Sequence, residues 1–82
     1  MAKIEDVNHI LGQLRELSED PAVPRNVRTK LTDTIKFLEN SDEISVRANK
    51  ALSELDSLAD DNNMDAYTRT QIYNIVSLLE KL

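Results

Sequence analysis

The chain has 82 residues, no cysteine, one histidine, one glycine and a formal net charge of −5. A chain this short makes one domain, residues 1–82, and its composition excludes a disulfide framework and a cysteine-based metal site. Its negative charge repels nucleic-acid backbones and anionic lipid surfaces. Because no run of consecutive apolar residues exceeds two, we expect no membrane span, no signal-peptide core and a soluble protein that is not exported by the signal-peptide route.

The sequence repeats itself at an offset of 41 residues, which pairs unit 4–41 with unit 45–82. Leucines, an aspartate and an arginine recur across the offset, and other apolar positions match in kind. The identical pairs include Leu11 with Leu52, Leu14 with Leu55, Leu17 with Leu58, Asp20 with Asp61, and Arg28 with Arg69. A repeat of this size is typical of a duplicated helix-loop-helix unit, and two such units can close around a shared core.

Four segments carry apolar residues at the three- and four-residue spacing of a helix, and none alternates with the period of a strand. Short polar connections between them favour antiparallel neighbours. The sequence therefore predicts an all-α fold, an antiparallel up-and-down four-helix bundle. Its core layers are expected to come from Leu11, Leu14, Leu31, Ile35, Leu52, Leu55, Ile72, Ile75 and Leu79.

The first helix is expected over residues 4–17. Gly12 falls opposite its apolar stripe, and we interpret it as a surface glycine; close approach of another chain is the alternative. His9, the single histidine, also lies away from the stripe. No cysteine, second histidine or nucleophile accompanies it, so the sequence offers no catalytic triad.

Pro21 and Pro24 mark the end of the first helix and the start of the second, because proline lacks the N–H group that only a first turn can spare. The second helix carries its apolar residues over 27–38, and the stretch from Pro24 to Glu39 that contains it is locally basic. Its cations are Arg25, Arg28, Lys30 and Lys36. This face carries our alternative functional hypothesis, a weak nucleic-acid-binding accessory, although an ordinary solvated face explains the same residues.

Between the second helix and the third, over residues 44–58, Asn40 and Glu43 have the spacing of a capping box. The polar loop 60–65 then precedes the fourth helix, which carries apolar residues over 72–82.

The loop before the fourth helix partly matches a calcium-binding loop. Asp61, Asn63 and Asp65 occupy the first three ligand positions, but Ala66 and Ile72 stand where that motif needs glycine and glutamate. We therefore expect helix capping here rather than a calcium site.

Two charged pairs repeat across the offset, Asp20 with Arg28 and Asp61 with Arg69. Each aspartate lies in a loop and each arginine in the first turns of the next helix. We interpret the pairs as electrostatic clasps that fix the loops, each contributing about 0 to 1 kcal/mol. A binding rim is the alternative interpretation.

Phe37, Tyr73 and Leu78 lie off the centres of the apolar stripes. They mark a second packing surface, or they wrap around a small, wide core. The first interpretation predicts a partner surface for a homodimer or an unknown protein partner. With no catalytic constellation and no cofactor motif in the sequence, we expect no enzyme but a non-catalytic protein–protein interaction or structural module.

Three stretches resemble a family of small archaeal proteins of uncharacterised function. They are Glu19 to Arg28, Ser45 to Ala48 and Tyr67 to Thr70. The resemblance covers nearly the whole chain and implies four helices, a cytoplasmic archaeal setting and no assigned activity. The family's second loop usually reads Asp-Pro-Asn-Met-Pro, whereas this chain lacks both prolines at residues 61–65.

A weaker likeness to HEAT repeats lies in Asp42 to Arg47, where an acidic turn leads into Val-Arg at the start of a helix. Two repeats are fewer than the three or so that a solenoid needs, so a closed bundle is the better interpretation.

Overall fold

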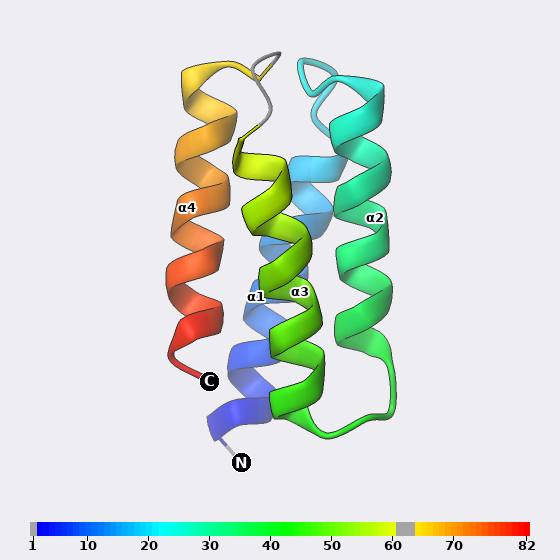
Figure 1. The fold of residues 1–82 in the computed structure, drawn as a ribbon, viewed down its shortest axis with the longest axis vertical. Coiled ribbons are helices and arrows are strands. Elements are labelled where there is room, and N and C mark those ends of the chain that lie inside the picture. The colour runs from blue at the N-terminus through cyan, green and yellow to red at the C-terminus, as the bar shows by residue number, and fades with distance from the viewer. Residues whose placement is uncertain (1, 61–63) are drawn as a thin grey trace.

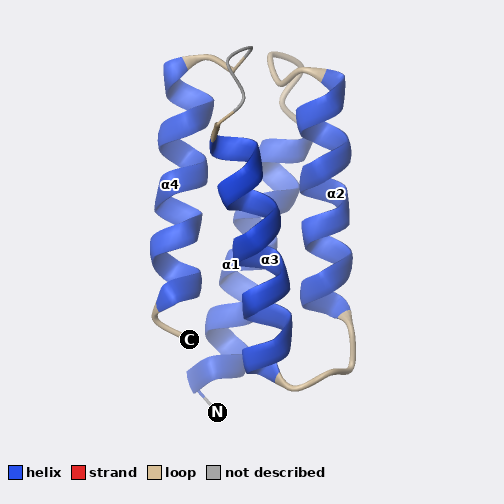
Figure 2. Cartoon of the chain, in the orientation of Figure 1, coloured by secondary structure: helices blue, strands red, loops and turns tan. Residues whose placement is uncertain are grey.

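The structure is a computed structural model that describes residues 2–60 and 64–82. Its elements are α1 (Ala2–Ser18), α2 (Arg25–Glu39), α3 (Ile44–Ala59) and α4 (Ala66–Glu80), and the described residues contain no strand (Figure 2). The helices alternate in direction along the bundle (Figure 1). The predicted all-α four-helix bundle is confirmed. Within the described residues, no helix is long and apolar enough to cross a bilayer.

Each helix packs against two neighbours, in the order α1, α2, α3, α4 and back to α1. Helices α2 and α4 are therefore diagonal to one another. The 41-residue offset carries residues 25–39 of α2 onto residues 66–80, which are those of α4. The bundle thus consists of two matching hairpins, and the α2–α3 seam corresponds to the α4–α1 seam.

The core is the set of apolar stripes facing the bundle axis. Leu14 and Leu55, which are equivalent in the two hairpins, are completely buried. Among the predicted core residues, Ile35 and Leu52 differ: they stay half-buried and pack against the core from its flank. They lie at the edge of their stripes, where a neighbouring helix covers only one side of the side chain.

Two threonines are buried in this core, which the apolar pattern did not predict. The Thr34 hydroxyl donates to the Lys30 carbonyl oxygen at 2.8 Å, one turn earlier in α2. The Thr68 hydroxyl has no hydrogen-bond partner among the described residues. Its equivalent in the first hairpin is the buried Val27, so the site accepts an apolar side chain of the same shape.

The helix ends correct one prediction. Asn40 follows α2, and its side-chain oxygen accepts from the Asp42 backbone N–H at 3.1 Å. Glu43 is itself the N-cap of α3 and makes no side-chain capping bond. The predicted capping box was wrong, because the box needs Asn40 as the N-cap and α3 begins only after Glu43.

The other helix boundaries predicted from the sequence agree with the structure. Pro24 is the N-cap of α2 and Asp65 that of α4, although the Asp65 side chain makes no capping bond. Gly12 is exposed, and nothing lies within 4 Å of the position a Cβ would take there.

Replacing either Leu14 or Leu55 by alanine should lower the free energy of unfolding by about 2 to 5 kcal/mol, because each leaves a cavity at a fully buried site. Urea denaturation followed by circular dichroism measures the loss. Leu52→Ala is the matched control and should cost less, since Leu52 is half-buried. A loss below about 0.5 kcal/mol, as at ordinary surface sites, would contradict this helix packing.

Thr68→Val should raise the free energy of unfolding by about 1 kcal/mol, because it removes a buried hydroxyl that lacks a partner. Thr34→Val is the control: its hydroxyl is bonded to a carbonyl, so no gain is expected there. Thermal unfolding of both variants and of the parent chain measures the two changes in stability. Equal gains in stability for Thr68→Val and Thr34→Val would disprove the explanation that the unpartnered Thr68 hydroxyl is destabilising.

Candidate functional site

A hollow of about 430 Å³ lies where α1 meets the end of α2 and the start of α3. We call it the end groove. Its lining residues are Ile4, Val7, Asn8, Leu11, Arg15, Leu38, Glu39, Ile44 and Arg47. Its apolar members come from all three helices, and Ile4 stands 60% exposed beside them. The end groove therefore presents apolar surface to solvent mainly through Ile4 and the half-buried Ile44.

The rim of the end groove carries both signs of charge. Arg15 forms an ion pair with Glu39 across α1 and α2. Arg47 donates to the backbone carbonyl oxygens of Asp42 and Leu38, which ties the start of α3 to the end of α2. The rim is thus pre-formed and is held by contacts between helices.

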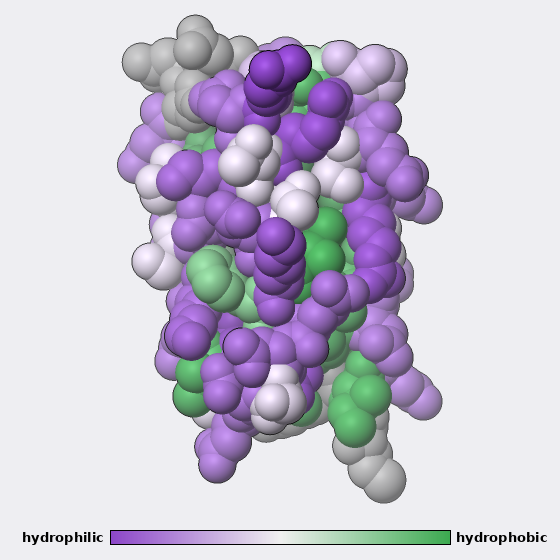
Figure 3. Space-filling model, turned by 90° about the vertical axis from the view of Figure 1, so that its right-hand side faces the viewer, coloured by the Kyte–Doolittle hydropathy of each residue, from purple (hydrophilic) through white to green (hydrophobic). Residues whose placement is uncertain are grey.

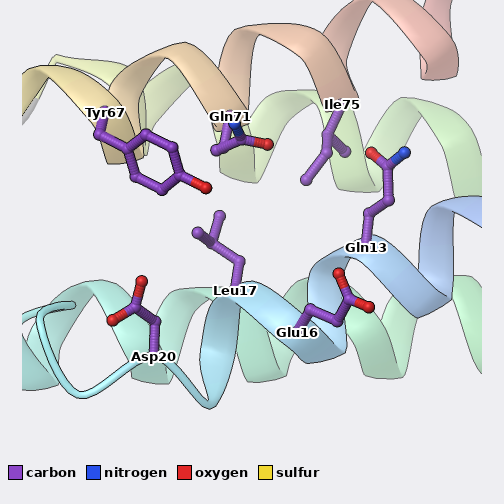
Figure 4. A pocket seen from close by; sticks show the side chains of 7 residues that line it. All are labelled: Gln13, Glu16, Leu17, Asp20, Tyr67, Gln71 and Ile75. Atoms are coloured by element: carbon purple, nitrogen blue, oxygen red, sulfur yellow. The ribbon is translucent and has the colours of Figure 1, made fainter.

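A second hollow of about 200 Å³ lies between α1 and α4, and we call it the α1–α4 cleft. In Figure 4 the Tyr67 side chain reaches from α4 toward α1, while Leu17 and the Asp20 carboxylate point toward it from the other side. The full lining is Gln13, Glu16, Leu17, Asp20, Tyr67, Gln71 and Ile75. Amides, carboxylates and a phenol thus surround a short apolar floor.

A smaller hollow of about 80 Å³ lies farther along the same seam, lined by Asp6, His9, Ile10, Leu78 and Lys81. The His9 Nε2 atom lies 3.0 Å from the Gln13 side-chain nitrogen, one turn later in α1. Across the described ranges, no three histidine or carboxylate side chains gather in a way that could hold a metal ion.

The first predicted clasp exists in a different form. The Arg28 guanidinium donates to the backbone carbonyl oxygens of Asp20 at 3.0 Å and Val23 at 3.2 Å. The Asp20 carboxylate instead accepts from the Ala22 backbone N–H at 2.9 Å. These hydrogen bonds therefore join the Arg28 cation to the loop backbone. The sequence instead suggested an ion pair between the side chains of Asp20 and Arg28. The equivalent pair, Asp61 with Arg69, and the calcium-like run that begins at Asp61 lie partly outside the described residues.

The structure does not bring Phe37, Tyr73 and Leu78 together. Leu78 faces α1, where it lines the small hollow, and Tyr73 lies about 140° away around α4 and is 53% exposed. Phe37 is half-buried on the diagonal helix α2. On the face over α2, apolar atoms show only as small separate patches among hydrophilic ones (Figure 3).

The basic face of α2 is partly engaged within the chain. Arg28 holds the preceding loop, and the Lys30 ammonium pairs with the Glu54 carboxylate of α3 at 3.1 Å. Arg25 and Lys36 are exposed. Two of the four cations thus already have partners, which leaves less charge for a phosphate backbone.

Arg28→Ala should lower the free energy of unfolding by about 1 to 3 kcal/mol, because two loop carbonyls lose a charged donor. Arg25→Ala, an exposed site three residues earlier, should stay within about 0.5 kcal/mol of the parent. Chemical denaturation of the two variants makes the comparison. Equal effects would mean that Arg28 acts only through its charge.

Comparison with known proteins places the chain in a family. The model of an uncharacterised protein family, UPF0147, matches residues 1–82. A UPF0147 protein of Pyrococcus furiosus is 39% identical over 85 residues, which cover 100% of this chain and 91% of that protein. A UPF0147 protein of Thermoplasma acidophilum is 40% identical over 76 residues, covering 92% and 86%.

A solved structure agrees with the fold. The crystal structure of MMP1188, a protein of unknown function, matches this chain with a TM-score of 0.93 at 39% identity, covering 96% of this chain and 91% of that one. The predicted resemblance to a small archaeal family without an assigned activity is confirmed. This chain belongs to the UPF0147 family of uncharacterised proteins.

Proposed function

We propose that this protein is a non-catalytic, cytoplasmic protein–protein interaction module, and that its partner at the end groove is a second copy of the chain. The observation that carries the proposal is the end groove itself. Ile4, at its edge, is 60% exposed, Ile44 is half-buried, and the buried Val7, Leu11 and Leu38 line it from below. Exposed apolar surface that is rimmed by polar groups is typical of protein contact sites.

The chemistry of the hollows supports a non-catalytic role. Nucleophilic catalysis needs a nucleophile within hydrogen-bond reach of a base. His9 is an exposed side chain whose recorded contact is the amide of Gln13, which can serve neither as nucleophile nor as acid. In the α1–α4 cleft the Tyr67 phenol lies near the carboxylates Glu16 and Asp20, but the Asp20 carboxylate accepts from the Ala22 backbone N–H.

Self-association is supported by the shape and charge of the end groove. A two-fold contact places the same patch on both chains, so each must offer both a projection and a recess. Ile4 provides the projection and the groove provides the recess. The rim likewise carries a positive charge on Arg15 and a negative charge on Glu39. Across a two-fold axis, each charge on one chain can therefore meet the opposite charge on the other chain. This site replaces the scattered Phe37, Tyr73 and Leu78 as the proposed contact.

Light scattering at micromolar concentration should give a dimer mass for the parent chain and a monomer mass for Ile4→Glu, because a carboxylate cannot enter an apolar recess without loss of hydration. Val46→Glu is the matched control: Val46 is 40% exposed but lies outside the end groove, so the dimer should persist. Added salt should strengthen the dimer, since it screens the repulsion between two chains of net charge −5.

A monomer mass for the parent chain would overturn self-association, and a monomer mass for Val46→Glu would overturn the location. The dependence on salt also distinguishes self-association from the competing hypothesis, nucleic-acid binding. Nucleic-acid binding through Arg25 and Lys36 would weaken steeply as salt rises, which is the opposite of the dependence expected for the dimer.

A further inference from the structure

The duplication allows one seam of the bundle to be compared with its equivalent. In the α2–α3 seam, Lys30 and Glu54 close the gap with an ion pair of 3.1 Å. The 41-residue offset carries these two residues onto Gln71 and Gln13, which line the α1–α4 cleft from α4 and from α1. The cleft therefore lies where its sister seam has a cation and its carboxylate, and here both have become neutral amides.

The cleft nevertheless contains negative charge. Glu16 and Asp20 line it, and no cationic residue belongs to its lining. Glu16 is exposed and takes part in none of the ion pairs that the described residues make. The Asp20 carboxylate accepts one backbone N–H, which leaves further acceptor capacity, while the nearby Arg28 is bound to carbonyl oxygens of the loop. A cation supplied from outside would therefore meet two carboxylates.

The other lining groups suit a cation that has an aliphatic stem. Leu17 and Ile75 form the apolar floor, against which a methylene chain packs while its charged head stays near water. The Tyr67 side chain is 62% exposed and reaches across the cleft, as Figure 4 shows, so its ring is available to a cation. At about 200 Å³ the cleft is smaller than the roughly 300 to 1,000 Å³ of small-molecule sites, and it matches one side chain.

We propose that the α1–α4 cleft binds a lysine or arginine side chain presented by a partner protein. The ammonium or guanidinium group sits between Glu16 and Asp20, where it supplies from outside the kind of charge that Lys30 supplies within the α2–α3 seam. The amide oxygens of Gln13 and Gln71 accept its remaining N–H groups. This site is separate from the end groove and stands whether or not the chain forms the proposed dimer.

Titration of the isotope-labelled full chain, followed by backbone amide chemical shifts, tests the proposal. The probes are the blocked amino acids N-acetyl-lysine N-methylamide and N-acetyl-arginine N-methylamide, and the neutral comparison is N-acetyl-norleucine N-methylamide. The cationic probes should give saturable shifts confined to residues 13–20 and 67–75, weakened by added salt. The norleucine probe should give none that saturate.

Three variants make the test specific. Glu16→Gln should weaken binding of the cationic probes by about two- to fivefold, the size expected for one exposed ion pair. Gln71→Lys should abolish probe binding by placing an internal cation in the cleft, as Lys30 does in the sister seam. Glu5→Gln is the control: Glu5 lies on the same face of α1 about three turns away, and its loss should change nothing.

An unchanged amide spectrum outside the cleft shows for each variant that the fold is intact. The proposal is overturned if the cationic probes give no saturable shift, if norleucine matches them, or if binding survives Gln71→Lys. It is also overturned if Glu16→Gln and Glu5→Gln have the same effect. None of these results depends on the oligomeric mass, so failure here is distinct from failure of the end-groove dimer.

Discussion

The bundle depends on one constraint: each helical hairpin has an apolar stripe that only the other hairpin can cover. Leu14 in α1 and Leu55 in α3 are both completely buried, and so are Leu31 in α2 and Ile72 in α4. Fully burying one such side chain contributes about 1.5 to 3 kcal/mol before its lost conformational freedom is counted. Because one hairpin alone would leave its stripe in water, the positions of the seams and hollows follow from how the two hairpins meet.

The number of helices and most of the core could be predicted from the sequence, because a spacing of three and four residues fixes which side chains share a face. The repeat also predicted matching helix bounds, as α2 and α4 show. Local bonding was less predictable. Whether Asn40 caps a helix or a turn depends on a shift of a few residues in the start of α3, and periodicity does not determine helix ends to that accuracy.

The candidate sites were harder to predict, because each is made by side chains from helices that are distant in sequence. Ile4 was recognised only as part of an apolar stripe, and its exposure could be seen only in the structure, where α1 begins beyond the end of α4 (Figure 1). Off-stripe position alone does not show that Phe37 and Leu78 lie on the diagonal helices α2 and α4. For the α1–α4 cleft a usable signal was present: Gln13 and Gln71 replace the charges of Glu54 and Lys30 at the repeat offset.

The turn at residues 40–43 determines how the two hairpins are connected. Residues 40–43 join the two hairpins, and α1 begins and α4 ends at that same end of the bundle (Figure 1), so no loop among the described residues spans the α1–α4 seam. Within the described residues, the 40–43 turn is thus the connection between the two hairpins. Exchange of a hairpin between two molecules would change the backbone of that turn while keeping the packing inside each bundle, which is the geometry of domain swapping.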